Sequence, residues 1–455
     1  MKDIAAYALE SLIKAGADKA ACKTSRGRRD EFNVEANKFT LMRTLFDDSL
    51  QMKVIKDHKK AITVINKLDK DSIDRAVADC IALTSSAQPD EAEDIAEKFE
   101  NKNFDQRSGG SDMNALFKRT EDFLEQLRDE FPKIVLESMA SEFKSAQTAY
   151  VNSNGVKFTN DAEYYFYSTM FSAKDGERSS SFSDSAAVLS SLAKPFMDVG
   201  MQRTLLEESV RSLDSRTVDE KFIGKVIVTP ACEDMIWHTL LDCFLSDLPM
   251  IEGTSRWKDS LGAKVADSKL TFRTSPLHPS AVLGERFTSD GFESHNTDFI
   301  RNGVLASFAL SLYGSNKTGK PRAGSTAGNI EVAAGDTPLA DMIKNVDHGI
   351  LLNRFSGASP GPSGDVSGVA KNSFLIENGK VTDALKETMV SFNIVDALMN
   401  IPAISKERCE NGVTVLPWCC FDGITISGKE GKCFNIAEVY GQSLDFSALL
   451  PVIII

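Results

Sequence analysis

The chain has 455 residues and a net charge of -13, with 42% hydrophobic and 26% charged residues, a composition typical of a globular protein with two or three domains. The acidic excess disfavours sequence-independent nucleic-acid binding, which depends on clustered Lys and Arg. No stretch reaches the about 18 apolar residues of a membrane span, and residues 1–15 lack the basic start and long apolar run of a secretory signal. We therefore expect a cytoplasmic protein that does not enter membranes and whose eight cysteines are reduced.

The first hundred residues predict a small α+β domain. A helical apolar pattern covers residues 4–15 and stops at Gly16. Residues 50–64 then alternate in a two-residue rhythm typical of strands, and a second helix begins after Asp71. We expect these helices to pack on a meandering sheet and to form a domain of residues 1–100.

An acidic and then glycine-rich stretch, residues 87–112, predicts a domain connection. A strongly amphipathic helix starts at Met113, and strands over residues 134–173 turn at Asn154-Gly155. Residues 183–213 are expected to be helical. Together these elements predict a central α+β domain of residues 101–218.

The last expected domain, residues 219–455, is β-rich and mixed. It opens with a strand at residues 222–228, followed by Thr229-Pro230 as an N-cap with proline at the first helical position. The helix then runs to about Leu245, with an apolar stripe that contains Ile236, Leu240 and Leu241. The uncharged tail, residues 449–455, is expected to be a buried strand. The fold class is thus α+β: N-terminal helix and sheet domains followed by a β-rich mixed C-terminal domain.

The helix after Thr229 holds three groups with catalytic potential: Cys232, Glu233 and His238. Zinc hydrolases place two histidines and a glutamate on one helix, but only one histidine is present here. Glu233 and His238 are five positions apart, about 140° around the helix axis. The pattern therefore favours an ordinary amphipathic helix over a complete zinc site.

Two other features have residue types that occur in functional sites. The adjacent Cys419–Cys420 pair cannot chelate a metal as a spaced pair does, and small buried residues of a strand explain it better. The glycine-rich run from Gly357 through Gly364 to Asp365 lacks the lysine of a phosphate loop. It fits a loop at the rim of a site, because loops on rigid scaffolds often carry function.

From about Phe287 onward the sequence resembles the PmbA/TldE branch of the TldD/PmbA peptidase family. Three stretches carry the resemblance: NGVLASFALSLYGSNKTGKPRAGSTAGNI, SGASPGPSGDVSGVAKNSFLIENGKV and NGVTVLPWCCFDGITISGKEG. The order of these stretches along the chain is as specific as the residues in them. A weaker likeness extends over nearly the whole chain.

The resemblance implies where zinc ligands would lie. TldD-like chains carry HExxxH on the helix that opens the C-terminal domain, and a cysteine just before a GKEG-like turn. The matching positions here hold Cys232, Trp237 and Ser427, and only Glu233 keeps the motif's residue type. The resemblance therefore implies no zinc or other cofactor in this chain, and no confident catalytic residue.

The implied function is a subunit that completes a cytoplasmic metalloprotease for peptides or unfolded polypeptides, with zinc held by a TldD-like partner. The family has also been called a modulator of DNA gyrase. Two alternatives remain: a homo-oligomeric peptide-binding module without a catalytic partner, and an autonomous hydrolase that uses Cys232 with His238. We expect association either with a TldD-like chain or with a second copy of this chain.

Overall fold

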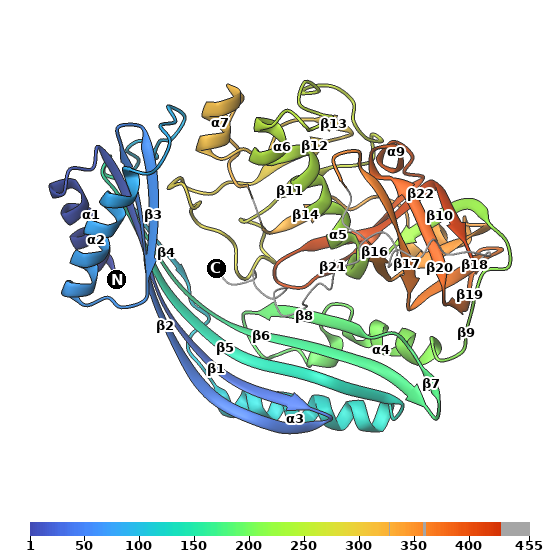
Figure 1. Ribbon diagram of the computed structural model, residues 1–455. Coiled ribbons are helices and arrows are strands. Elements are labelled where there is room, and N and C mark those ends of the chain that lie inside the picture. Colours follow the sequence, from blue (N-terminus) through green and yellow to red (C-terminus); the bar gives the residue numbers. More distant parts are fainter. Residues whose placement is uncertain (327, 358–360, 429–455) are drawn as a thin grey trace, which may run out of the picture.

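The first half of the chain forms an eight-stranded, strongly curved sheet (Figure 1). The structure is a computed structural model, and it describes residues 1–326, 328–357 and 361–428. The strands of this sheet are β1 (Lys19–Glu35), β2 (Lys38–Lys56), β3 (Lys59–Ile65), β4 (Lys102–Gln106), β5 (Ile134–Asn152), β6 (Lys157–Asp175), β7 (Arg178–Ser179) and β8 (Ser183–Leu189). Their order is β3-β2-β1-β5-β6-β4, and β7 and β8 also pair with β6.

Tight turns join the long strands. Asp57 and His58, between β2 and β3, both have positive φ, as expected of the hairpin turn whose twist matches the strands that flank it. Between β5 and β6, Gly155 has a φ of 96°, which confirms the turn predicted at Asn154-Gly155. All neighbouring strand pairs in this path are antiparallel except β4 with β6.

The helices of this half pack on the sheet in two groups. They are α1 (Lys2–Lys14), α2 (Lys70–Thr84), α3 (Met113–Glu130), a short turn η1 (Phe196–Asp198) and α4 (Gln202–Arg211). The helices α1 and α2 share one core with one end of β1, β2 and β3, whereas α3 and α4 share another core with β1, β5 and β6. The predicted helices at residues 4–15, after Asp71 and from Met113 are confirmed.

Two predictions for this half need correction. Residues 183–213 are not one helical region, because Ser183–Leu189 pairs with β6 as β8 before the short helix α4 begins. The expected connection at residues 87–112 contains β4, which adds a parallel edge to β6. In both places pairing with a long neighbouring strand overrides weak local preferences. The domain boundary expected near residue 100 falls between strands that share this one sheet.

The second half is built on a mixed sheet that has 14 strands among the described residues. Its strands are β9 (Ser215–Arg216), β10 (Phe222–Val228), β11 (Phe272–Thr274), β12 (Thr297–Arg301), β13 (Val304–Leu305), β14 (Ile330–Val332), β15 (His348–Leu352), β16 (Arg354–Gly357), β17 (Asp365–Lys371), β18 (Ser373–Glu377), β19 (Lys380–Leu385), β20 (Thr388–Asn393), β21 (Ala403–Glu410) and β22 (Val415–Ser427). The main path is β13-β12-β11-β14-β22-β10-β15-β18-β19-β9, so β10 and β22 lie at its centre.

In the part of this half that the structure describes, five short helices and one π-helical turn accompany this sheet. They are α5 (Pro230–Leu240), η2 (Leu241–Leu245), α6 (Asp247–Ile251), α7 (Leu312–Thr318), α8 (Leu339–Lys344) and α9 (Ile394–Met399). The helices α5 and α9 both lie against β22, and one large apolar core joins them to the sheet.

Contacts at two separate places hold the second half to the first. At one place Tyr313 donates its hydroxyl to Asp90 across 2.9 Å, and Lys102 lies 2.6 Å from Glu293. An aromatic cluster that includes Phe104 and Phe287 packs beside this ion pair. At the other place the Asn372 amide donates to Ser183 Oγ across 2.7 Å. The second half therefore lies over the curved sheet and contacts it at well separated points (Figure 1).

The expected fold class, α+β with a β-rich C-terminal part, is confirmed. The tail expected to be a buried strand, residues 449–455, lies outside the described residues. Among the helices that the structure describes, none is both long and apolar enough to cross a membrane.

Candidate functional site

The candidate site is centred on α5, the helix that follows the central strand β10. Thr229 has extended backbone angles, and Pro230 occupies the first turn, where its missing N–H costs nothing. The Thr229 hydroxyl makes no capping bond, so proline rather than a side-chain cap marks this start. After Leu240 the helix widens into the π turn η2. Such turns often occur at functional sites.

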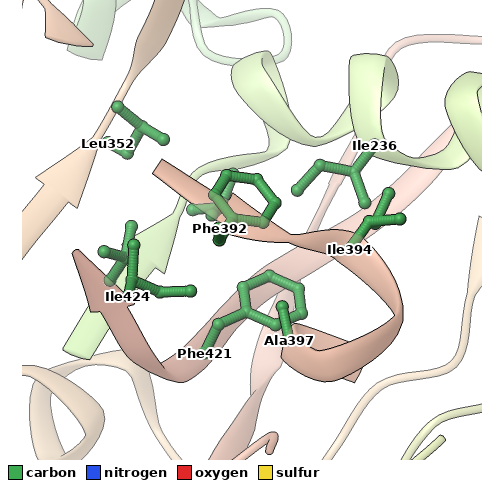
Figure 2. A pocket seen from close by; sticks show the side chains of 9 residues that line it. Ile236, Leu352, Phe392, Ile394, Ala397, Phe421 and Ile424 are labelled. Atoms are coloured by element: carbon green, nitrogen blue, oxygen red, sulfur yellow. The ribbon is translucent and has the colours of Figure 1, made fainter. Parts of the chain in front are cut away.

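The inner face of α5 is mostly apolar, and Glu233 is the charged residue type buried on it. Ile236, Leu240 and Leu241 are all buried, which confirms the predicted stripe. Beside Ile236 lies a cavity of about 10 Å³, room for roughly one water molecule. Figure 2 shows that Ile236, Leu352, Phe392, Ile394, Ala397, Phe421 and Ile424 surround it. Because all the lining side chains are apolar, this space offers no group that could polarise a substrate.

Glu233 points into the protein and not toward solvent. Its side chain is fully buried, and the Trp237 indole N–H donates to its Oε2 across 3.0 Å. Burial raises the pKa of Glu233 to about 8, while hydrogen bonds from Cys419 and Trp237 oppose this shift. The carboxyl is therefore mostly protonated near neutral pH, as expected of an acid removed from water without a cationic partner.

Cys232 is buried beside Glu233. Burial first, and then the neighbouring carboxyl, raise the pKa of the Cys232 thiol to about 12. The nucleophile of a cysteine hydrolase is a thiolate in a partly exposed, electropositive environment. Cys232 has neither property, which argues against the autonomous cysteine-dependent hydrolase.

His238 lies on the opposite, exposed face of α5. Its Nε2 is 3.4 Å from Asp234 Oδ1, one turn earlier. The hydrogen bond that His238 donates to Asp234 raises the pKa of His238, while partial burial lowers it. The structure does not bring His238 together with Cys232, because a spacing of six residues places them on different faces of the helix.

Ser427 lies far from the other degenerate motif positions. It ends β22 and pairs there with Met389 of β20. Glu233 interacts with Cys419, which is eight residues earlier on the same strand. At about 3.3 Å per residue these eight residues span roughly 25 Å. Cys232 and Trp237 are thus near Glu233, whereas Ser427 is not.

The expected rim loop joins β16 to β17 and lies partly outside the described residues. The strand before it passes the start of α5, where Phe355 contributes a backbone hydrogen bond to Cys232. Gly357 pairs with Gly368 across the hairpin. Gly364 has a φ of 80°, and a Cβ there would approach Phe244 to 3.1 Å. Asp365 accepts a hydrogen bond from the Asn393 amide across 2.9 Å. The described residues on either side of this loop therefore lie near the two ends of the α5–η2 helix.

The residues at the degenerate motif positions do not fit a hydrolytic zinc site. Such a site needs about three protein ligands and an open position for water. Trp237 offers only an N–H donor, the Cys232 thiol is protonated and buried, and Ser427 lies at the far end of β22. Within residues 1–326, 328–357 and 361–428, no three His, Cys, Asp or Glu side chains form a group that could hold a metal ion.

Sequence reasoning missed the role of Cys419. The adjacent Cys419 and Cys420 point to opposite faces of β22, and only Cys419 faces α5 and acts on Glu233. The two-residue rhythm of a strand could have predicted that one of the pair faces the helix. No signal in the sequence links it to Glu233, which is 186 positions earlier (419 minus 233).

Comparison with known proteins gives consistent likenesses. Residues 223–428 match the family described as the PmbA/TldA metallopeptidase C-terminal domain. The chain is 26% identical over 152 residues to the metalloprotease PmbA of Escherichia coli O157:H7, a stretch that covers 33% of this chain and 34% of that relative.

Two solved structures share the fold over almost the whole chain. TldE from Thermococcus kodakarensis has a TM-score of 0.81 at 18% identity, and the match covers 92% of this chain and 100% of that one. A candidate modulator of DNA gyrase from Bacteroides thetaiotaomicron has a TM-score of 0.80 at 19% identity, with 94% and 99% covered.

Proposed function

The chain belongs to the TldD/PmbA metallopeptidase family, and we propose that it is a zinc-free subunit of a complex that hydrolyses peptides or unfolded polypeptides. In this proposal the zinc ion and the general base come from a TldD-like partner chain, and this chain contributes no ligand and no nucleophile.

The observation that carries the proposal is the burial of Glu233. A general base must reach the water that it deprotonates, within hydrogen-bond distance or through one water molecule. Glu233 is fully buried, accepts a hydrogen bond from Trp237 and has a pKa raised to about 8 by that burial. A mostly protonated carboxyl that faces a sheet cannot serve as base to a metal-bound water on the outer side of the helix.

The same arrangement supports a structural role for this part of the chain. Trp237 fills the position of a ligand with a large apolar ring that stacks on Phe272, 5.1 Å away between ring centroids. Buried aromatic pairs of this kind stabilise a core beyond the area that they bury. Where a catalytic relative needs an open metal site, this chain has a closed and well packed helix.

The outer face of α5 and the loop between β16 and β17 are the parts that could meet a peptide or a partner. Asp234, His238 and Asp242 are exposed on that face, one turn apart from each other. In the proposed complex this polar face would border the partner's site without taking part in bond cleavage.

Metal analysis tests the proposal. The chain would be purified alone and together with a TldD-like chain from the same genome, and zinc would be measured in both samples by mass spectrometry. We expect close to no zinc in the chain alone and about one zinc ion per pair in the complex, as for a single hydrolytic site. Near-equimolar zinc in the isolated chain would contradict the proposal.

A further inference from the structure

A long segment of β2 forms a free edge of the first sheet. The strand β3 pairs with β2 only from Leu50 to Lys56, whereas β1 pairs with β2 along its whole length. No described element pairs with the outer edge of residues 38–49, where β2 borders the sheet (Figure 1). Natural sheets usually blunt such edges, because unpaired backbone groups template pairing with another chain.

This edge carries unusually exposed apolar side chains. Met42 and Phe46 are 71% and 76% exposed, and Phe39 and Leu41 are also exposed. On β1, Phe32 lies opposite Met42 and Arg28 lies opposite Phe46. Because opposite residues share a face, the Met42 and Phe46 side chains both project from the sheet face that carries α3. A free edge flanked by large exposed apolar groups is typical of an interface and not of a solvated strand.

The other face of the same segment carries charges. The Arg43 Nε is 2.5 Å from Glu31 Oε1, which leaves the two terminal nitrogens of the guanidinium for a further partner. The Asp47 side chain makes no hydrogen bond or ion pair within the described residues and is exposed. One cationic and one anionic group are therefore presented four residues apart.

We propose that β2 pairs antiparallel with β2 of a second copy of this chain, about a two-fold axis at Thr44. A two-fold axis perpendicular to the sheet places residues whose numbers sum to 88 opposite each other and keeps each face continuous. Met42 of each copy then lies opposite Phe46 of the other. The two most exposed apolar side chains of the edge are thus buried in two symmetric pairs. On the other face each Arg43 lies diagonal to Asp47 of the other copy, within reach of its long side chain.

The occupant follows from this self-complementarity. Both favourable pairings, Met42 with Phe46 and Arg43 with Asp47, involve only residues 41–47, and the two-fold axis repeats each of them. The register irregularity between β1 and β2, near Asn33 and Val34, lies outside this segment. An unrelated strand would have to supply both an apolar and a charged match by its own sequence. The proposal goes beyond the proposed function and does not depend on it, because the β2 edge shares no residue with α5.

Sedimentation velocity tests the pairing first. The wild-type chain would be compared with a Met42→Glu/Phe46→Glu variant over about 1 to 100 µM, because mass action makes a dimer concentration-dependent. We expect dimers of the wild type and a dissociation constant raised about tenfold or more in the variant, since central apolar contacts dominate interfaces. Ile223→Glu is the matched control, because Ile223 is 71% exposed on β10, and it should leave the dimer unchanged.

Disulfide trapping tests the register. Opposite residues of antiparallel strands have Cβ atoms about 4.5 to 5.5 Å apart, close to disulfide geometry. A mixture of Met42→Cys and Phe46→Cys chains should therefore crosslink on mild oxidation, whereas either variant alone and the wild type should not. Circular dichroism would check that each variant is folded.

Three results would overturn the proposal. They are a wild-type monomer at the highest concentration, a dimer insensitive to the double substitution, or efficient crosslinking of Met42→Cys alone. If the chain alone is monomeric and the double substitution prevents capture of a TldD-like chain, the edge binds a different subunit and self-pairing fails. Zinc content measured on the wild type remains an independent test of the proposed function.

Discussion

Trp237 donates its indole N–H to the Glu233 carboxyl across 3.0 Å, one helical turn away on the buried side of α5. The ring also stacks on Phe272 of β11. This pair turns the only surviving position of a zinc-hydrolase motif toward the core. A glutamate that would otherwise be an unpaired buried acid thus becomes part of the packing between helix and sheet.

The first prediction concerns Glu233 and pH. Its pKa is about 8 in the folded chain against 4.5 as the ordinary value, so folding favours the protonated form. The stabilisation that Glu233 contributes is fully present below about pH 4.5. It is lost as the pH rises toward 8, because the unfolded chain releases the proton first. Relative to its value below pH 4.5, the free energy of unfolding is therefore lower by roughly 3 kcal/mol at pH 7, because each pH unit between the two pKa values costs about 1.4 kcal/mol.

Glu233→Gln removes this loss, because the amide oxygen still accepts from Trp237 and carries no charge. Urea titrations should show the variant more stable than the wild type at pH 8 and nearly equal to it at pH 5. Glu208 and Glu285, whose pKa values burial also raises, are present in both proteins and cancel in the comparison. Glu220→Gln on the surface is the control. A variant less stable than the wild type at pH 8 would contradict the burial of a mostly neutral acid.

The second prediction concerns Trp237. Trp237→Ala should lower the free energy of unfolding by about 3 to 5 kcal/mol, as large-to-small changes in a core do. Trp237→Phe keeps the stacking on Phe272 but removes the indole N–H that donates to Glu233, which should cost about 1 to 3 kcal/mol. Thermal melts of both variants check the order. Equal stability of the phenylalanine variant and the wild type would show that the hydrogen bond to Glu233 contributes nothing.

The third prediction concerns thiol reactivity. Because burial raises the pKa of Cys232 to about 12 and that of Cys419 well above its usual range, few thiolates exist at pH 8. Iodoacetamide should label neither residue in the native chain, and both should react after unfolding in urea. Ile223→Cys, at a 71% exposed position, supplies a positive control within the same fold. Rapid native labelling of Cys232 would reopen the cysteine hydrolase.

Much of the fold could be predicted from local patterns. The helix at Met113 has a clear period of 3.6 residues, the strand at residues 222–228 is a short apolar run, and both are present as α3 and β10. Residues 183–189 were expected to be helical but pair with β6. A short run of small residues has little preference of its own, so a distant strand determines its conformation.

The site was predictable only in part. The sequence contains Cys232, Glu233 and Trp237 on one helix, but the direction in which Glu233 points depends on which face packs against β22. The resemblance to TldD-like chains also implies that Ser427 belongs with them, whereas the strand carries it roughly 25 Å beyond Cys419. Long-range pairing of β10 with β22 decides this, because it places Val228 next to Cys419.

The most direct measurement of the central claim is peptide hydrolysis by the reconstituted complex with one glutamate changed at a time. In this chain Glu233→Gln should leave the turnover rate unchanged, because Glu233 is buried and touches no substrate. The same change in the HExxxH motif of the TldD-like partner should lower turnover by about 100-fold or more, the usual effect of losing a general base. Metal content and complex size would be measured on each sample, so that a loss of activity is not a loss of assembly. Loss of turnover in the Glu233→Gln complex, with zinc and assembly intact, would contradict the account.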